Sequence, residues 1–189
     1  RVGGRPAAGF ATVAHLVPML SLENAYNEGE LREFHGRVCR GLGQPETAAL
    51  AYVAELKIDG VSLSLTYERG RLVRGVTRGD GVTGEDVTSN VRVIKAVPDT
   101  LQGPAASDRM EIRGEVYLPR QVFLKMNEER EAAGDVPFAN PRNAAAGALR
   151  TLDAKAVARR GLSAFTYQVV VPAAEPAPAA THRSEEHTS

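Results

Sequence analysis

The first strong pattern of hydrophobic residues along the chain has the period of an α-helix. Leu31, Phe34 and Val38 follow one another at intervals of three or four residues, so they share one face of a helix. Asn27 stands where a helix cap is expected, and two glycines follow the last hydrophobic position. These features predict a helix over 28–40.

From about position 52 the period shortens to two. Hydrophobic residues at 61, 63 and 65 alternate with small polar residues, which predicts a strand with one buried face. A polar turn that contains glycine, over 68–71, separates it from a second strand over 72–77. The first strand is also expected to extend back through 55–60.

The second half of the chain places helices between further strands. Thr83 and Asp153 each stand where they would cap a helix, and Pro119 opens another. The helices are expected over 85–93, 119–133, 143–149 and 154–159, and the strands over 110–118 and 162–171. Because the strands come in hairpins between isolated helices and not in βαβ order, the expected fold class is α+β with antiparallel sheets.

Composition favours a single globular domain without a broad basic surface. Of the 189 residues, 43% are hydrophobic and 24% are charged, which is enough for one core and short of two full domains. The 23 basic and 23 acidic residues give a formal net charge of zero, whereas nucleic-acid-binding domains usually carry a basic excess. Any grip on DNA must therefore be local or come from other parts of a longer protein.

The cysteine and histidine content excludes several other classes. Cys39 is the single cysteine, so no internal disulfide forms, and the four histidines are too scattered for a metal cage. We expect Cys39 to be a packing residue of the first helix. No apolar run approaches the roughly 18 residues of a membrane span, and no signal peptide opens the chain. A soluble, cytoplasmic protein is therefore expected.

The strongest chemical signal is a run of alternating charges directly before a glycine. On a strand, Glu55, Lys57 and Asp59 would share one face, with the leucine and isoleucine between them in the core. Gly60 would leave space for a ligand or a neighbouring backbone. A lysine is a nucleophile only when neutral, and flanking carboxylates favour its charged form. Bound Mg2+ drawing on the carboxylates would offset them; a solvated strand with weak ion pairs is the alternative.

Two further features concern phosphate binding. Arg142 and Arg150 flank an alanine-rich stretch; on a continuous helix they would lie about 80° apart and could bind phosphate, although helix-end arginines are commonly just solvated. The stretch 79–84 matches the G-x-G-x-x-G pattern of dinucleotide-binding folds, with Asp99 and Asp108 near the position of the expected acid. The preceding strand is the return arm of a hairpin and no βαβ unit follows, so the Rossmann interpretation is disfavoured.

The order of these motifs resembles one protein family. Lys57-Ile58-Asp59-Gly60 is similar to the nucleophile motif of the covalent nucleotidyltransferases, which are DNA ligases, RNA ligases and mRNA capping enzymes. Stretches at 19–24, 77–86, 113–116 and 138–150 follow in the order found in bacterial NAD+-dependent DNA ligases, and the last is highly specific to them. Nearly the whole chain resembles their adenylation (nucleotidyltransferase) domain, which implies an ATP-grasp-like ligase fold, here incomplete.

The resemblance implies a catalytic set of residues. Lys57 would attack the α-phosphorus of NAD+ and take AMP. Asp59 and Glu115 would orient metal-bound water without binding the metal directly. Arg142 and Arg150 would bind phosphate of the adenylate or of the nicked DNA.

The resemblance also implies a set of nucleotide-binding residues with three kinds of role. These are contact with the adenylate and its ribose, recognition of adenine, and closure of the pocket by a backbone turn. Arg78 and Glu115 would make the first kind of contact, and Glu55 and Tyr167 would recognise adenine. Ser21 and Leu22 would close the pocket. Lys57 and Gly60 would lie beside the nucleotide.

The implied reaction seals nicked double-stranded DNA in three steps: AMP passes from NAD+ to the lysine, then to the 5′-phosphate, and leaves when the 3′-hydroxyl attacks. It would use NAD+ and Mg2+, with zinc expected only in a C-terminal part outside this chain. A monomer without membrane association is expected. Two alternatives stay open, namely an ATP-dependent nucleotidyltransferase (a DNA or RNA ligase or a capping enzyme) and a non-catalytic nucleotide-binding module.

The resemblance also predicts how the chain is divided. Residues 1–27 are expected to be a connector from an N-terminal NMN-binding region, with a loop over 1–17, and 28–171 a partial adenylation domain. Residues 172–182 are expected to be a linker, and 183–189 resemble a translated adapter sequence and are expected to be non-native. The chain is therefore expected to be a fragment that is inactive alone.

Overall fold

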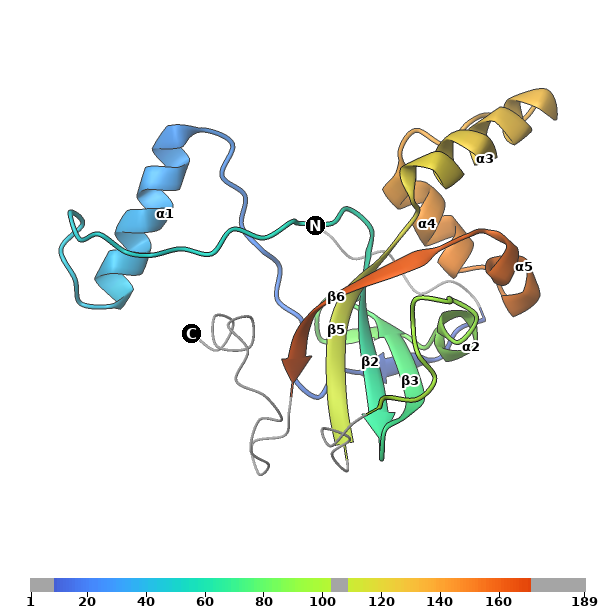
Figure 1. Cartoon of the computed structure of the whole chain (residues 1–189), viewed down its shortest axis with the longest axis horizontal. Helices are drawn as coiled ribbons and strands as arrows, with labels where there is room; N and C mark the ends of the chain where they lie inside the picture. Colours follow the sequence, from blue (N-terminus) through green and yellow to red (C-terminus); the bar gives the residue numbers. More distant parts are fainter. Residues whose placement is uncertain (1–8, 103–108, 171–189) are drawn as a thin grey trace. The chain divides into compact units, whose positions relative to one another are not determined.

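The computed structural model describes residues 9–102 and 109–170, which form two compact units. One unit comprises residues 20–57. The other comprises the described residues up to 19 and from 58 onward, and it contains the β-sheets. Figure 1 labels the helices and most of the strands of both units.

The unit of residues 20–57 is built around α1 (Glu28–Gly41), where the hydrophobic period predicts a helix. The side chain of Asn27 accepts a hydrogen bond from the Glu30 amide at 2.9 Å, which satisfies a donor at the helix start. Cys39 is fully buried, with its Sγ 3.4 Å from His35 Nε2. The predicted helix and the packing role of Cys39 are therefore confirmed.

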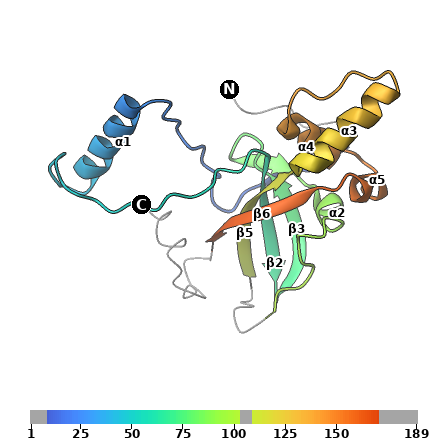
Figure 2. The ribbon, with the colours of Figure 1, turned by 45° about the horizontal axis from the view of Figure 1, so that its top comes forward.

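The larger unit is built on a four-stranded antiparallel sheet with the order β3-β2-β5-β6 (Figure 2). Its strands are β2 (Val61–Glu68), β3 (Arg71–Thr77), β5 (Arg109–Tyr117) and β6 (Ser163–Val170). The two residues that join β2 to β3, Arg69 and Gly70, have positive φ of 48° and 74°, as a tight hairpin turn that matches strand twist requires. The antiparallel pairing of all four strands, with the helices outside the sheet, confirms the predicted α+β class.

One face of this sheet forms the hydrophobic core. Leu63, Leu65 and Tyr67 on β2 are at most 2% exposed and belong to one cluster with buried residues of the helices. Figures 1 and 2 show the helices gathered on the same side of the sheet. They are α2 (Thr88–Val91), α3 (Arg120–Ala132), α4 (Pro141–Leu149) and α5 (Ala154–Arg159), and the last three confirm the predicted positions.

Helix α4 approaches the sheet closely because its inner face is made of small side chains. Ala144 and Ala145 are at most 1% exposed and Leu149 is fully buried, and the helix contacts both β2 and β5. The Asn140 side chain caps the helix by accepting a hydrogen bond from the Asn143 amide at 2.8 Å. The cap fixes the start of α4, and the buried small side chains let the helix pack directly on the two central strands.

The strand expected over 55–60 is not formed. Residues 51–59 have no regular secondary structure, β2 begins only at Val61, and Leu56, expected in the core, is 78% exposed. A strand needs a hydrogen-bonding neighbour. The neighbouring strand β5 is followed by Pro119 and then α3, so it turns away and offers these residues no partner.

A second, two-stranded sheet pairs β1 (Thr12–Ala14) with β4 (Thr83–Glu85). It corrects two expectations, a loop throughout 1–17 and a helix over 85–93. Thr83 lies in a strand and caps no helix, and α2 is much shorter than expected. Each of these strands forms because its backbone pairs with a segment far away in the sequence, which no local pattern of three residues reveals.

The second face of β2 is polar but buried, so the strand is not half-exposed as its alternation predicted. Ser64 and Thr66 are 3% and 8% exposed. Arg113, opposite Ser64 on β5, donates hydrogen bonds to the carbonyl oxygens of Val17 at 2.7 Å and Pro18 at 3.2 Å. The segment that follows β1 therefore covers this face of the sheet near Arg113.

The predicted linker over 172–182 and the non-native tail over 183–189 lie outside the described residues. Among the helices of the described part, none combines the length and the apolar character needed to cross a bilayer.

Replacing Leu149 with alanine should lower the free energy of unfolding by about 2–5 kcal/mol, because its side chain, at the end of α4, is fully buried in the hydrophobic core. Leu152, which is 66% exposed, provides the matched control, and Leu152→Ala should change that free energy by less than about 0.5 kcal/mol. Chemical denaturation of the 189-residue chain measures both values. Equal losses in the two variants would contradict the packing described for α4.

Candidate functional site

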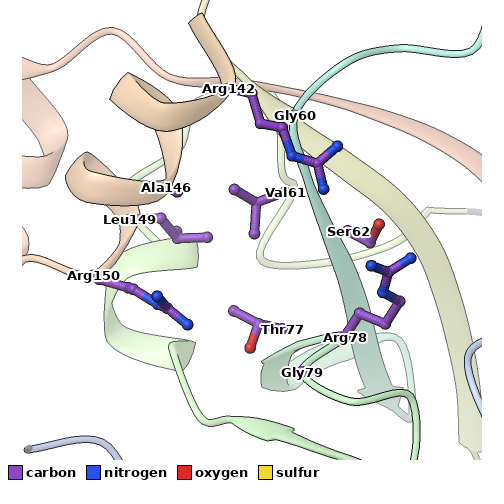
Figure 3. A pocket seen from close by; sticks show the side chains of 10 residues that line it. All are labelled: Gly60, Val61, Ser62, Thr77, Arg78, Gly79, Arg142, Ala146, Leu149 and Arg150. Carbon is purple, nitrogen blue, oxygen red and sulfur yellow. The ribbon is translucent and has the colours of Figure 1, made fainter. Parts of the chain in front are cut away.

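A pocket in the larger unit lies between the start of β2, the end of β3 and helix α4 (Figure 3). Arg142 reaches it from the first turn of α4, Arg150 from the position directly after that helix, and Arg78 from the position directly after β3. The other lining residues are small or apolar: Gly60, Val61, Ser62, Thr77, Gly79, Ala146 and Leu149. The fold thus gathers all three arginines singled out in the sequence around one space.

Two of these arginines are held by carboxylates of very different exposure. Arg142 Nη1 lies 3.2 Å from Asp59 Oδ1, with the two side chains 40% and 68% exposed. Arg150 Nε lies 2.7 Å from Glu85 Oε2, and the Glu85 side chain is only 4% exposed. An exposed pair contributes about 0–1 kcal/mol, so Arg142 can exchange its partner readily, whereas a short bond to a buried carboxylate restrains Arg150.

The loop after β3 fixes the backbone at Arg78. The Arg78 carbonyl accepts a hydrogen bond from His15 Nε2 at 3.1 Å. The Asp80 side chain accepts hydrogen bonds from the amides of Thr83 and Val82, which hold the pKa of its carboxyl below the ordinary value. Because this loop leads into β4 and not into a helix, it is a shaped turn, and the Rossmann interpretation has no basis in the fold.

Glu115 and Tyr167 lie on the strands beside β2. Glu115 stands opposite Ser62 in the β2–β5 register and is 8% exposed. A bulge in the β5–β6 pair leaves Tyr167 without an opposite residue. Burial raises the pKa of the Tyr167 phenol and the charge of Glu115 raises it further, against the lowering influence of Arg113 and Arg78. These electrostatic influences indicate that Tyr167 lies near Glu115 and Arg78.

Gly60 makes a very close backbone approach to β5 at the edge of the pocket. A Cβ atom at this position would lie 2.2 Å from the Val116 carbonyl oxygen and 3.0 Å from Glu115 Cγ. No side chain fits in that space, so the backbone just before β2 rests directly on β5. Of the two uses expected for this glycine, the approach of a neighbouring backbone is the one that the structure displays.

The other residues expected at the site belong to the unit of residues 20–57. Ser21, Leu22, Glu55 and Lys57 are exposed and lie outside helices and strands. Lys57 is the last residue of that unit, and two residues separate it from Gly60 of the pocket.

Three residues that shape the site have no assigned role in the sequence analysis. His15 and Glu85 contact Arg78 and Arg150, from which they are 63 and 65 residues distant in the chain. Arg113 bonds to the buried Glu111 at 2.8 Å while its other nitrogens hold the segment after β1. Such long-range pairs leave no local pattern, and Glu85 was even expected to begin a helix.

The carboxylates near the pocket fit a metal that is held mainly by other ligands. In the described part of the chain, no three His, Cys, Asp or Glu side chains form a group that could hold a metal ion. Asp59 and Glu115 therefore suit Mg2+ only where phosphate oxygens and water supply most of the ligands, which is how Mg2+ is usually bound with nucleotides.

Gly60→Ala should lower the free energy of unfolding by about 1–3 kcal/mol, because the added methyl group must push β2 away from β5. Gly147→Ala is the matched control, since nothing lies near an added Cβ in that turn of α4, and it should leave stability unchanged or raise it by up to about 1 kcal/mol. Urea denaturation of both variants tests this. A Gly60→Ala chain as stable as the parent would show that the close approach is not real.

Comparison with known proteins agrees with the order of the motifs in the sequence. The family model described as NAD-dependent DNA ligase adenylation domain matches residues 7–188. Similar curated proteins named DNA ligase occur in Desulforudis audaxviator and Thermotoga neapolitana, with 55% and 56% identity over 89% and 91% of this chain. The match covers 25% and 24% of those two proteins, so the chain spans about a quarter of the length of the curated relatives it matches. The chain belongs to the NAD-dependent DNA ligase adenylation domain family.

Proposed function

We propose that this chain carries the nucleotide-transfer site of an NAD+-dependent DNA ligase, with Lys57 as the nucleophile that takes AMP. The observation that supports this most directly is the arrangement of Arg78, Arg142 and Arg150 around the pocket at Gly60 (Figure 3). Guanidinium groups bind phosphate oxygens with two parallel hydrogen bonds. A pocket with three of them suits the pyrophosphate of NAD+, and the proposed nucleophile precedes its glycine by three residues.

In the proposed first step, the neutral amine of Lys57 attacks the α-phosphorus of NAD+. A nitrogen–phosphorus bond forms, the bond from that phosphorus to the bridging oxygen breaks, and its electron pair leaves with nicotinamide mononucleotide. The amine proton passes to water. AMP is then transferred to the 5′-phosphate at the nick, and attack by the 3′-hydroxyl forms the phosphodiester bond and releases AMP.

The arginines would supply the positive charge that phosphoryl transfer requires. Catalysis of this reaction depends mainly on positioning and on neutralising charge at the phosphate oxygens. The exposed pair of Arg142 and Asp59 is weak enough for a phosphate group to displace the carboxylate. Asp59 would then be free to orient water near the reacting phosphate, while Arg150 keeps its bond to Glu85.

The adenosine part of the substrate would be recognised on the polar face of the sheet. The partial burial of Tyr167 beside Glu115 supports stacking of its ring on adenine and a hydrogen bond from a ribose hydroxyl to the carboxylate. Glu55 would accept a hydrogen bond from the adenine amino group. Ser21 and Leu22 would close the pocket with their backbone.

Mg2+ would supply additional neutralisation of the phosphate charge when it is bound. In this proposal Asp59 and Glu115 do not bind the ion directly but hold its water molecules by hydrogen bonds. Both carboxylates are therefore expected to be needed for adenylation, and most of all at low Mg2+ concentration.

For the whole protein we propose the sealing of nicks in double-stranded DNA during replication and repair. It would act in the cytoplasm as a monomer, with zinc only in a part outside this chain. The formal net charge of zero is consistent with a DNA grip supplied largely by such other parts. The 189-residue chain by itself is expected to gain little AMP, because recognition of the nicotinamide half would also lie elsewhere.

Incubation of the full-length protein with NAD+ and Mg2+ should add the mass of one AMP, and Lys57→Ala should abolish this gain, since no other amine is expected to reach the α-phosphorus. Intact-protein mass spectrometry measures the adduct, and peptide mapping locates it. Lys125→Ala, which removes a lysine whose side chain is 77% exposed on α3, is the control and should adenylate normally. An adduct that persists in the Lys57→Ala protein would refute the proposal.

The same assay separates the two alternative functions. An ATP-dependent nucleotidyltransferase would form the adduct with ATP and not with NAD+, releasing pyrophosphate in place of nicotinamide mononucleotide. A non-catalytic binding module would bind the nucleotide and gain no covalent mass. We expect NAD+ alone to support adduct formation.

A further inference from the structure

We propose that Asn90 and Glu85 act as positioning residues that together hold Arg150 in the orientation needed to bind phosphate. The inference deepens the proposed function and rests on it, because it concerns how one of the pocket arginines is fixed. Neither residue lines the pocket. Both would act only through Arg150.

Asn90 holds the main chain on both sides of Arg150. Its Nδ2 donates hydrogen bonds to the carbonyl oxygens of Leu149 at 2.6 Å and of Thr151 at 2.8 Å. A primary amide has two N–H donors, so both protons are used on the two carbonyls that flank one residue. We call these two hydrogen bonds, together with the bond from Arg150 to Glu85, the Arg150 clamp. Asn90 is fully buried in α2, so its amide is held in the core.

The Asn90 amide binds the main chain at the C-terminal end of α4. Arg150 follows the last residue of α4 and has φ −89° and ψ 9°. The last carbonyl groups of a helix lack partners within the helix, and helix ends fray unless another group satisfies them. The Asn90 amide supplies that group from a different element, so the backbone that carries Arg150 is tied to the core and not only to its own helix.

Glu85 restrains the guanidinium group of Arg150. Its Oε2 accepts from Arg150 Nε at 2.7 Å, and its side chain is 4% exposed. The Glu85 amide in turn donates to Thr77 Oγ1 at 3.0 Å, which ties β4 to the end of β3. A guanidinium has five N–H donors, so one bond at Nε fixes its plane and leaves others for a phosphate.

The choice of asparagine points to use of its donors. Within the described residues Asn90 Oδ1 has no hydrogen-bond partner although it is buried, and an unsatisfied buried acceptor is unfavourable. An apolar side chain would avoid that cost if packing were the only task. The arrangement is explained when the two carbonyl groups beside Arg150 require the donors.

Arg142 at the opposite end of α4 lacks such a double restraint in the described structure. Among the described residues its side chain bonds to Asp59, whose side chain is 68% exposed. The two arginines therefore differ in kind. Arg150 is held by a buried amide and a buried carboxylate before any ligand arrives, and such preorganisation is what electrostatic stabilisation of a transition state needs.

A double-mutant cycle in the full-length protein tests the proposal, with the single-turnover rate of nick sealing as the readout. Arg150→Ala should lower this rate by at least about 30-fold, and Glu85→Gln and Asn90→Leu should each lower it by about 10-fold or more. If both residues act through the arginine, either change should have an effect of less than about twofold in the Arg150→Ala background. A merely structural role would give the same fold-loss in both backgrounds.

Asn127→Leu is the matched control. Asn127 also donates from Nδ2 to a main-chain carbonyl, that of Phe138 at 3.0 Å, but it lies in α3 and does not line the pocket. Its rate should stay within about twofold of the parent, and thermal unfolding of each variant ensures that all rates are taken on folded protein. A loss in Asn127→Leu equal to that in Asn90→Leu would overturn the positioning role.

The outcomes separate this inference from the proposed function. If Glu85→Gln or Asn90→Leu lowers the sealing rate as much in the Arg150→Ala background as in the parent, the clamp is overturned, while Lys57 remains the proposed nucleophile. Normal sealing by Arg150→Ala, together with failure of Lys57→Ala, would also overturn the clamp, because there would be nothing to position. Adenylation that survives in Lys57→Ala would remove the function itself, whatever the arginine variants do.

Discussion

The close packing of α4 on the central strands is the constraint on which the pocket depends. Small side chains on the inner face of the helix, with Ala144 and Ala145 almost fully buried, let its backbone lie near β2 and β5. Arg142 and Arg150 leave from the two ends of this helix, and Arg78 leaves from the end of β3. The distance from Arg78 to the two arginines of α4 is therefore set by how closely the helix packs on the sheet.

Charge in the chain is balanced overall and concentrated locally. Three like charges around one pocket repel each other, and the carboxylates of Asp59 and Glu85 offset that repulsion before any ligand is present. Because one of these carboxylates is exposed and the other is buried, the pocket combines an exchangeable contact with a fixed one. The proposed binding site for phosphate thus requires no basic surface.

Gly60 links this pocket to the segment that contains the proposed nucleophile. The residues before it are not hydrogen-bonded into the sheet, so the course of the chain as it enters β2 is set at the glycine, where its backbone meets the Val116 carbonyl. The alternation around Lys57 is real in the sequence but does not describe a strand. Lys57 is identified by the motif that it forms with Asp59 and Gly60, and not by its position on the face of a strand.

The sequence by itself determined the helices and strands whose signals are local. The periodic positions of α1, the caps at Asn140 and Asp153, and the hairpin of β2 and β3 are properties of a few neighbouring residues. The motif order also identified the family. Tertiary structure alone decided that Thr83–Glu85 is a strand, that the polar face of β2 is buried, and that His15 and Glu85 reach the pocket arginines. Each of these depends on a backbone or side-chain partner far away in the sequence, and such a partner becomes a neighbour only after the chain has folded.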